Sequence, residues 1–343
     1  MTELKAAEQL TVALFLRAAL RLAALAAVLA AAAGITFGYL GWAHAAFDSF
    51  SHFRMHLAAG LLVLVLPMAL LRFYPEAVFA ALLAIGSIVQ TAGLPFAGMA
   101  ARAVGTDAPA TYRLLQLNMR YDNREPERTL SLIGEMKPDI ITLNEVSALW
   151  IERLKVLEAA YPHRMICPPP AYIGGSAILS RRPFAAGTAP SCGDRGSLAQ
   201  ATLDIGGSRV EIAALHLGWP WPYEQPWQLP HLEPVLSQIG DTAIVAGDFN
   251  AVPWSRTTRR VAAASGTSIL RGIGPTWLSY RLPETWRGWI GLPIDNVLVK
   301  GAVVPLDLRA LDNAGSDHLP VLLEFRLLPE EKPAAVQQAK LGQ

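Results

Sequence analysis

The stretch Ala243-Ile244-Val245-Ala246-Gly247-Asp248-Phe249-Asn250 places two polar side chains directly after a short apolar run. Ala243–Ala246 has the length and composition of a buried β-strand, and the residues that follow favour a turn. A strand end is a place where a rigid sheet can present side chains to a shared site. Taken alone, the segment fits equally well an ordinary turn in which Asp248 and Asn250 bond the local backbone.

The same arrangement recurs along the second part of the chain. Polar residues that can bind a metal ion or move a proton lie within a residue or two of the end of an apolar run. Besides Asp248 and Asn250, these residues are Asn118, Glu145, His216, Asp295, Asp317 and His318. Each one could be a turn residue or an exposed strand end. Turn formation does not explain why the whole set shares one kind of position, so we expect a common site.

Short β-rich runs alternate with amphipathic stretches in this part of the chain. The predicted strands are Tyr112–Leu117, Ile140–Leu143, Ser176–Leu179, Ala199–Leu203, Val210–Leu215, Ala243–Ala246, Asn296–Val299 and Leu319–Leu327. A helix is predicted over Glu125–Met136, because Pro126 suits a first turn and Lys137-Pro138 ends the pattern. So many short strands interleaved with helices predict one large domain of mixed α/β architecture.

The first part of the chain is much more apolar. Of the 343 residues, 52% are hydrophobic and 17% are charged, and the apolar excess lies almost wholly before residue 110. Three runs there approach the roughly 20 apolar residues that a membrane-spanning helix needs. Buried core helices, or a cleaved signal peptide for the first run, are the alternatives. Three such runs in series leave no partner elements for a soluble core, so we predict membrane spans.

The chain is thus expected to divide into four segments. They are a membrane domain over residues 1–104 with spans at about 20–40, 55–71 and 77–99, a linker over 105–111, an α/β domain over 112–328 and a flexible tail over 329–343. Lys5, Arg17, Arg21 and Arg72 favour a cytoplasmic amino terminus, with Arg54 as the exception. An odd number of crossings then places the α/β domain outside the cytoplasm.

The two cysteines, Cys167 and Cys192, do not have the spacing of a zinc site or a disulfide framework. They could pair with each other in an oxidising compartment. We expect two buried free thiols instead.

The ordered motifs of the second part resemble those of the endonuclease/exonuclease/phosphatase superfamily. That family includes DNase I-like nucleases, abasic-site endonucleases, neutral sphingomyelinases and inositol polyphosphate 5-phosphatases. The motifs are Gln116-Leu117-Asn118, Leu143-Asn144-Glu145, Leu215-His216-Leu217, Gly247-Asp248-Phe249-Asn250, Ile294-Asp295-Asn296 and Ser316-Asp317-His318-Leu319-Pro320. The resemblance covers about Tyr112–Leu328 and implies a four-layer α/β sandwich, with a catalytic cleft at one edge of two facing mixed sheets. Asn144 departs from the pattern, since the family more often has Gln there.

The resemblance also implies roles for the polar residues. Glu145 would be the principal metal ligand, with Asn118 beside it and Asp317 nearby, and such oxygen ligands suit Mg²⁺ or Mn²⁺. Asp248 would orient or deprotonate the attacking water, and Asn250 would donate a hydrogen bond to the phosphoryl oxygens.

Two histidines complete the implied site. His318, held by Asp295, would contact the scissile phosphate and stabilise the transition state. His216 would lie near the leaving group and act as a general acid. We therefore predict a membrane-anchored phosphodiesterase of bacterial type, set in the inner membrane. A catalytically silent binding module on a membrane anchor is the alternative of another class.

The substrate is less well defined by the sequence. The chain has 29 Lys and Arg against 28 Asp and Glu, which excludes a basic protein that coats DNA. Arg256, Arg259 and Arg260 could touch a polynucleotide or form a solvated helix face. A nuclease-like substrate is favoured over a phospholipid or sphingolipid headgroup, and the expected partners are this substrate and the lipid bilayer, with no obligate protein partner.

Aromatic residues flank two of the motifs. They are Trp219, Trp221, Tyr223 and Trp227 after His216, and Trp286 and Trp289 before Asp295. Such side chains could stack on bases, lie at the level of lipid headgroups, or pack as a lid.

Overall fold

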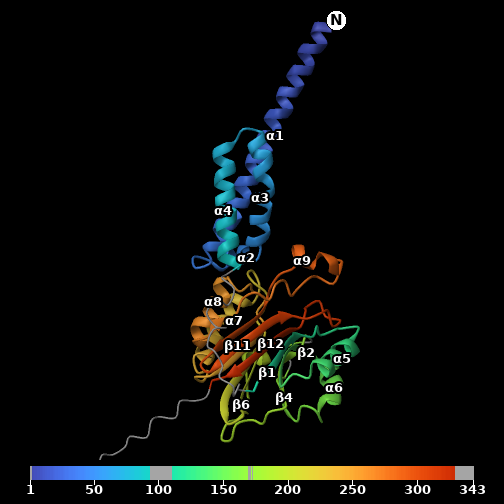
Figure 1. Cartoon of the computed structure of the whole chain (residues 1–343), viewed down its shortest axis with the longest axis vertical. Coiled ribbons are helices and arrows are strands. Elements are labelled where there is room, and N and C mark those ends of the chain that lie inside the picture. The colour runs from blue at the N-terminus through green and yellow to red at the C-terminus, as the bar shows by residue number, and fades with distance from the viewer. Residues whose placement is uncertain (1, 93–109, 169–170, 172, 329–343) are drawn as a thin grey trace, which may run out of the picture.

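A computed structural model describes residues 2–92, 110–168, 171 and 173–328, in which a helical bundle stands on an α/β domain (Figure 1). The helices of the bundle are α1 (Thr2–Tyr39), α2 (Ala45–Ser51), α3 (Arg54–Leu70) and α4 (Tyr74–Ala92). Two helices, over Glu8–Tyr39 and Tyr74–Ala92, are long and apolar enough to cross a membrane, and the bent pair of α2 and α3 would make a third span.

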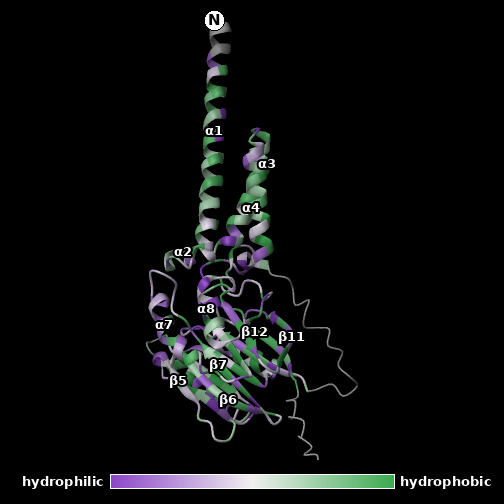
Figure 2. Cartoon of the chain, turned by 90° about the vertical axis from the view of Figure 1, so that its left-hand side faces the viewer, coloured by the Kyte–Doolittle hydropathy of each residue, from purple (hydrophilic) through white to green (hydrophobic). Residues whose placement is uncertain are grey.

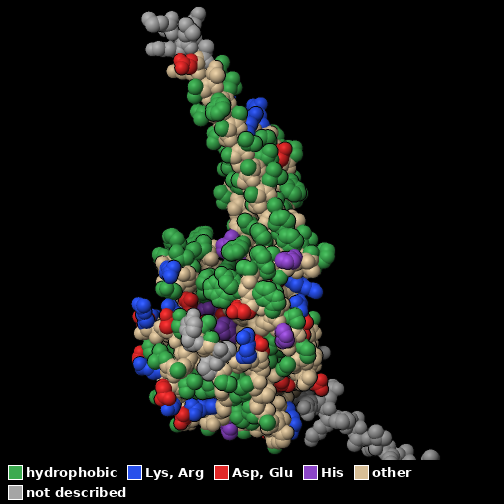
Figure 3. Space-filling view, turned by 180° about the vertical axis from the view of Figure 1, so that it is seen from behind, with side chains coloured by type: hydrophobic (Ala, Val, Ile, Leu, Met, Phe, Trp, Pro, Cys, Tyr) green, Lys and Arg blue, Asp and Glu red, His purple; other side chains and the backbone are tan. Residues whose placement is uncertain are grey.

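The bundle packs through small and branched residues and presents apolar side chains outward. Its core contains Val28 and Ile35 of α1, Leu61 of α3 and Ala84 of α4. Hydrophobic residues dominate its outer surface, while charged side chains gather on the α/β domain (Figures 2 and 3). An apolar outer surface of this extent is expected for helices that face lipid. The end of the third predicted span (residues 93–99), most of the linker and the tail after residue 328 lie outside the described residues.

Two six-stranded mixed sheets form the centre of the α/β domain. The first has the order β11-β12-β1-β2-β4-β3 and the second the order β5-β6-β7-β8-β10-β9. In the first sheet these are β1 (Tyr112–Asn118), β2 (Ile140–Val146), β3 (His163–Ile166), β4 (Gly175–Ser180), β11 (Val303–Ala310) and β12 (Val321–Leu327). In the second they are β5 (Ser191–Gly193), β6 (Leu198–Ile205), β7 (Ser208–Leu215), β8 (Ala243–Asp248), β9 (Ser268–Ile269) and β10 (Asp295–Lys300).

Helices cover the outer face of each sheet. Against the first sheet lie α5 (Pro126–Met136) and α6 (Ala148–Arg153), followed by the short 3-10 helix η1 (Leu154–Leu157). Against the second lie α7 (Gln225–Leu236) and α8 (Arg256–Ser265). The loops hold η2 (Asp194–Gly196), η3 (Glu284–Trp286) and α9 (Arg287–Ile290). The two sheets pack face to face through one buried cluster, which confirms the predicted four-layer α/β sandwich.

The alternation of side chains along the strands positions the polar residues. In β1, Leu115 and Leu117 pack against the helices, so Leu114, Gln116 and Asn118 point toward the second sheet. In β8 the same alternation turns Asp248 toward the first sheet, because Ile244 and Ala246 lie in the inter-sheet core. The polar ends of strands from both sheets therefore face each other.

The predicted strands are all present, but the short edge strands β3, β5 and β9 and the strand β11 were not predicted. The expectation of two free thiols was wrong: Cys167, directly after β3, forms a disulfide with Cys192 of β5, with 5.6 Å between the Cα atoms. Strand β3 lies at one edge of the first sheet, and β5 lies at one edge of the second. Because the pairing joins two different sheets, the spacing along the chain gave no sign of it. Cys192 is also exposed rather than buried.

Direct hydrogen bonds fix the bundle to the α/β domain. The carboxylate of Asp48 in α2 accepts from the backbone N–H groups of Arg256 (2.6 Å) and Thr257 (2.8 Å), which begin α8. These N–H groups have no partner within their own helix, and a negative charge at this position is favourable. The guanidinium of the buried Arg54 donates to the carbonyl oxygen of Trp254 at 3.1 Å. We call this contact region the junction.

Candidate active site

Asp248 lies at the centre of the polar strand ends and is 1% exposed. Its Oδ2 accepts from Asn118 Nδ2 (2.9 Å) and its Oδ1 from the backbone N–H of Asn250 (2.7 Å). Its own backbone N–H donates to Asn144 Oδ1 (2.8 Å). These bonds join β8 of the second sheet to β1 and β2 of the first, so the carboxylate is held from three sides.

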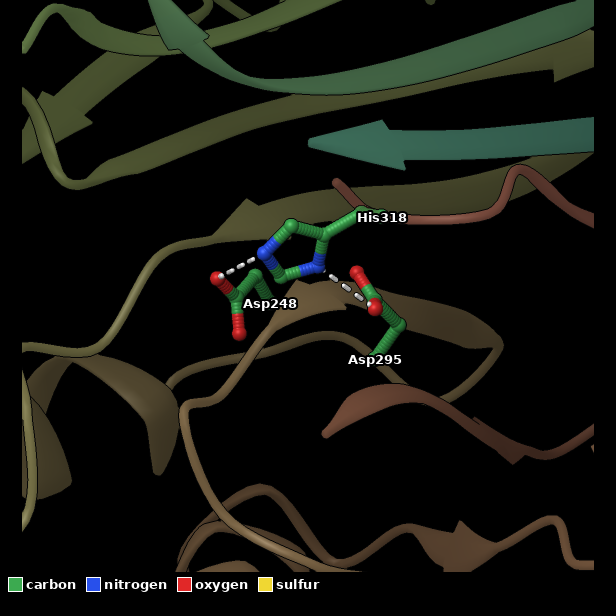
Figure 4. A group of neighbouring side chains, drawn as sticks. All are labelled: Asp248, Asp295 and His318. Carbon is green, nitrogen blue, oxygen red and sulfur yellow. Dashed lines mark hydrogen bonds and ion pairs between the residues drawn. The ribbon is translucent and has the colours of Figure 1, made fainter. Parts of the chain in front are cut away.

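His318 lies between two buried carboxylates (Figure 4). Its Nδ1 is 2.8 Å from Asp295 Oδ2, and its Nε2 is 3.6 Å from Asp248 Oδ2. The second oxygen of Asp295 accepts from Gln116 Nε2 at 3.1 Å, which ties β10 to β1. His216 Nε2 is also 3.6 Å from Asp248 Oδ2, and this imidazole is the more exposed of the two.

For both Asp248 and His318, burial shifts the pKa in one direction and the neighbouring opposite charges shift it in the other. Burial raises the pKa of Asp248 to about 6, although the positive charge of His318 opposes the shift. Burial lowers the pKa of His318, but the charges of Asp295 and Asp248 and the hydrogen bond to Asp295 outweigh it and raise the pKa to about 10. His318 is therefore a cation at neutral pH, and Asp248 is a carboxylate of increased basicity.

Glu145 adopts an uncommon backbone conformation at the end of β2. Its φ is +58°, and the pairing of β2 with β4 is irregular between Leu143 and Val146. Strained backbone of this kind concentrates at functional sites. The carboxylate accepts from Asn118 Nδ2 (3.0 Å) and from the backbone N–H of Tyr121 (2.8 Å). Glu145 and Asp248 thus approach the same amide group.

Asn250 and Asp317 lie at the edge of this group. Asn250 Nδ2 donates to the carbonyl oxygen of Leu217 at 2.9 Å, which leaves its second amide hydrogen available. Asp317 Oδ2 accepts from the indole N–H of Trp277 at 3.3 Å. Among the described residues, no hydrogen bond or ion pair joins the Asp317 side chain to the other seven predicted residues. The structure therefore brings seven of the eight predicted residues into one connected group and leaves Asp317 beside it.

Comparison with known proteins agrees with this geometry. Residues 115–318 match the model of the Endonuclease/Exonuclease/phosphatase family. The chain belongs to this family. Members of this family are hydrolases that act on phosphodiester bonds, and the resemblance in the motifs is confirmed.

Solved structures share the fold. The endonuclease/exonuclease/phosphatase from Beutenbergia cavernae is 23% identical with a TM-score of 0.50, covering 63% of this chain and 72% of its own. The family member from Bacteroides vulgatus is 16% identical with a TM-score of 0.52, covering 64% and 100%. Among curated proteins, the RNA-directed DNA polymerase from mobile element jockey of Drosophila melanogaster is 27% identical over 177 residues. The match covers 48% of this chain but only 18% of that polymerase.

The donor set near Glu145 fits a hard divalent cation, on which hydrolases of this family depend. Glu145 and Asn118 offer oxygen atoms, and the Asn118 oxygen, which accepts from the Arg120 N–H at 3.0 Å, keeps a second lone pair. Among the described residues, no Lys or Arg pairs with Glu145. A cation would offset the negative charges of Glu145 and Asp248, which both accept a hydrogen bond from the Asn118 amide.

A second group could hold a metal by distance alone. Ligand atoms of Asp248, Asp295 and His318 lie within 4.8 Å of one another. All three are buried, and His318 Nδ1 is already at hydrogen-bond distance from Asp295. We interpret these three as a hydrogen-bonded group in which one imidazolium lies between two carboxylates, rather than as a metal site.

Three supporting residues were missed as site residues. Gln116 and Asn144 are fully buried and link Asp295 and Asp248 across the two sheets, and Ser316 Oγ donates to the carbonyl oxygen of Asn118 at 2.7 Å. The sequence could have identified Gln116 and Asn144. Gln116 lies two positions before Asn118 in β1 and Asn144 one position before Glu145 in β2, and each interrupts an otherwise apolar strand.

In the basic cluster on α8, Arg256 and Arg259 are exposed and Arg260 is half-buried, which fits a solvated helix face. Arg260 pairs with Glu233 at 2.7 Å, Arg259 donates to the Trp254 carbonyl oxygen at 2.7 Å, and the Arg256 N–H is bound by Asp48. The aromatic residues after His216 are largely exposed: Trp219, Trp221, Tyr223 and Trp227 are 58%, 44%, 56% and 61% exposed.

Proposed function

We propose that this chain is a membrane-anchored, divalent-metal-dependent phosphodiesterase. The observation that supports the proposal is the convergence of polar strand ends from both sheets around Asp248. Glu145 and Asn118 would hold the metal ion, with Asp317 close by. When bound, the ion supplies charge neutralisation at the non-bridging oxygens of the ester.

Asp248 is the residue proposed to take a proton from the attacking water. Its raised pKa makes it a better base than an exposed aspartate, and Asn118 and Asn250 fix its orientation. A bond forms between the water oxygen and phosphorus while the bond to the leaving oxygen breaks. The negative charge that develops on the phosphoryl oxygens then needs hydrogen-bond donors.

The two histidines are proposed to supply donors near the same oxygen of Asp248, from which each Nε2 is 3.6 Å away. Asp295 fixes the orientation of the cationic His318, and its Nε2–H, which is 3.6 Å from Asp248 Oδ2, is proposed to donate to a phosphoryl oxygen. His216, which is the more exposed, is proposed to give a proton to the leaving oxygen. Asn250 contributes its remaining amide hydrogen.

The proposed location is a membrane, with the catalytic domain outside the cytoplasm. The two long apolar helices and the bent third pair support the anchor. The N-terminal end of α1 and the turn between α3 and α4 lie at the end of the bundle away from the α/β domain (Figure 1). The disulfide supports an oxidising compartment for the catalytic domain.

The test is hydrolysis of a chromogenic phosphodiester by the purified full chain in detergent. We expect activity that is lost with a chelator, returns with Mg²⁺ or Mn²⁺, and falls by at least about 100-fold in Glu145→Ala. Glu135→Ala, at an exposed glutamate of α5, is the matched control and keeps its activity. Activity that survives both chelation and Glu145→Ala would refute the assignment, and no activity in the wild type would favour the silent binding module.

A polynucleotide is a second candidate substrate, because the exposed aromatic residues after His216 could stack on bases. Hydrolysis of labelled DNA or RNA that weakens strongly with added salt would support it.

A further inference from the structure

A pocket of about 430 Å³ lies between the bundle and the catalytic domain. One wall comes from α3 and α4, and the other from the loop over residues 270–293 and the segment after Asn250. The lining is mostly apolar and includes Met55, Ala59, Trp254, Leu270, Ile273 and Trp289. Pockets of roughly 300–1,000 Å³ with such a lining are typical of small-molecule sites.

One polar atom in this lining has no partner. His56 lines the pocket, and its Nδ1 is buried without a hydrogen bond in the described part of the chain. Buried polar atoms are nearly always paired, so an unpaired one indicates a ligand or a water. A molecule with an apolar chain and an oxygen near one end could pack against the apolar lining and form a hydrogen bond with the His56 imidazole.

The pocket and the active site share a wall. His52 lines the pocket, and its Nε2 is 3.1 Å from the carbonyl oxygen of Asn250. Pro293, another lining residue, lies two positions before Asp295. Trp277 packs in the same cluster as Met55 and donates its indole N–H to Asp317. A molecule in the pocket would therefore touch His52, which lies at hydrogen-bond distance from the Asn250 backbone of the site.

The pocket also lies at the level where the bundle would leave a bilayer. Trp289 is 82% exposed, and its neighbours Trp286 and Ile290 are 50% and 42% exposed. In Figure 1, α9, which carries Trp289 and Ile290, lies level with the base of the bundle. Figure 3 shows hydrophobic side chains continuing from the bundle onto this shoulder of the catalytic domain. Tryptophan is enriched at membrane interfaces, because its ring is apolar and its N–H is polar.

We infer that this pocket receives the apolar chain of a membrane lipid, and that the phosphate ester hydrolysed at the adjoining site is carried by that lipid. The second half of the inference rests on the proposed function, whereas the first half does not. Nucleic acid as substrate, and occupation of the pocket by residues 93–109 or by a second copy of the chain, are the competing outcomes.

Photolabelling tests the pocket. The full chain is reconstituted in phosphatidylcholine vesicles containing phosphatidylcholine with a diazirine on one acyl chain, and labelled residues are mapped by mass spectrometry. We expect label on Trp254 and Leu270. Both line the pocket and belong to the catalytic domain, so lipid around the outside of the bundle would not label them. Ala59→Phe, which fills the pocket, lowers this label by about tenfold. Val63→Phe, one turn further along α3 and 74% exposed in the wild type, leaves it unchanged.

Label confined to the outward-facing residues of the bundle would overturn the inference. Label on Trp254 and Leu270 that is insensitive to Ala59→Phe would overturn it as well. Occupation by residues 93–109 or by a second copy gives the first of these results.

Parallel turnover assays test the substrate. The substrates are a soluble chromogenic phosphodiester, single-stranded DNA, and vesicles of phosphatidylcholine, phosphatidylethanolamine and phosphatidylglycerol with labelled headgroups. We expect headgroup release, and a ratio of headgroup release to soluble-ester turnover that falls about tenfold in Ala59→Phe but not in Val63→Phe. Hydrolysis of the soluble ester or of DNA without headgroup release would overturn the lipid substrate. Absence of soluble-ester hydrolysis in the wild type defeats the proposed function, while the photolabelling result still decides the pocket.

Discussion

The active site and the junction are both built from hydrogen bonds between distant parts of the chain, but they use different chemistry. In the site, side chains bond side chains, as Asn118 does with Glu145 and Asp248. In the junction, side chains of the bundle mostly bond backbone groups of the catalytic domain, as Asp48 and Arg54 do. A contact between two side chains restricts the residue type at both positions, so it produces a recognisable motif in the sequence. A contact between a side chain and a backbone group restricts the residue type at one position only, so it produces no such motif.

The largest expected effect belongs to the site. Asp248→Asn keeps the shape of the side chain and an oxygen that can accept from Asn118, but it removes the proposed base. We expect kcat for a soluble phosphodiester to fall by about 10³-fold, the combined scale of lost proton transfer and altered site charge. Unchanged circular dichroism and thermal denaturation check that the fold is intact. A loss of under tenfold would show that another group takes the proton.

A change at the outer strands of the two sheets calibrates the comparison. Replacing Cys167 and Cys192 by Ser removes a cross-link between positions 25 residues apart. We expect the free energy of unfolding to fall by about 3 kcal/mol, measured by denaturant titration of the detergent-solubilised chain. The activity at low temperature stays close to that of the wild type. A variant that unfolds normally but loses activity would connect the sheet edge to the site.

Asp295→Asn separates positioning from proton transfer. Asp295 touches His318 and Gln116, and we have assigned it no contact with the substrate. We expect kcat to fall by about 10²-fold, because His318 loses both its orientation and the charge that keeps it protonated. The KM changes much less than kcat. Equal changes in KM and kcat would contradict a positioning role.

The smallest effect is expected at the junction. Asp48→Ala leaves two backbone N–H groups at the start of α8 without their acceptor, which costs about 1 kcal/mol. The measurement is thermal denaturation together with limited proteolysis between the bundle and the catalytic domain. Asp312→Asn, at an exposed aspartate, is the matched control and changes neither. A loss of activity as large as that of Asp248→Asn would show that the junction acts on the catalytic residues.

The sequence predicted the fold class, the strands that carry the site and the family. It did so because Asn118, Glu145 and Asp248 follow apolar strands whose alternation fixes the direction of each side chain. It could not predict that the Asp317 side chain accepts a hydrogen bond from Trp277, because that depends on the path of a loop. Nor could it predict the disulfide, which required knowing that two edge strands of different sheets lie together.

The sequence could not predict the junction either, because its contacts join distant positions of the chain. His52 and Asn250 are 198 positions apart, and the contact uses the Asn250 carbonyl oxygen, which every residue type provides. The pocket beside them arises only when the bundle and the catalytic domain pack together.

The central claim is that polar strand ends of two sheets form one site for a divalent cation and a phosphate ester. The most direct test is Mn²⁺ binding to the full chain, followed by electron paramagnetic resonance, in the wild type, in Glu145→Ala and in Glu135→Ala. The account predicts saturable binding in the wild type and in Glu135→Ala, and its loss in Glu145→Ala. Binding to Glu145→Ala that matches the wild type would contradict it.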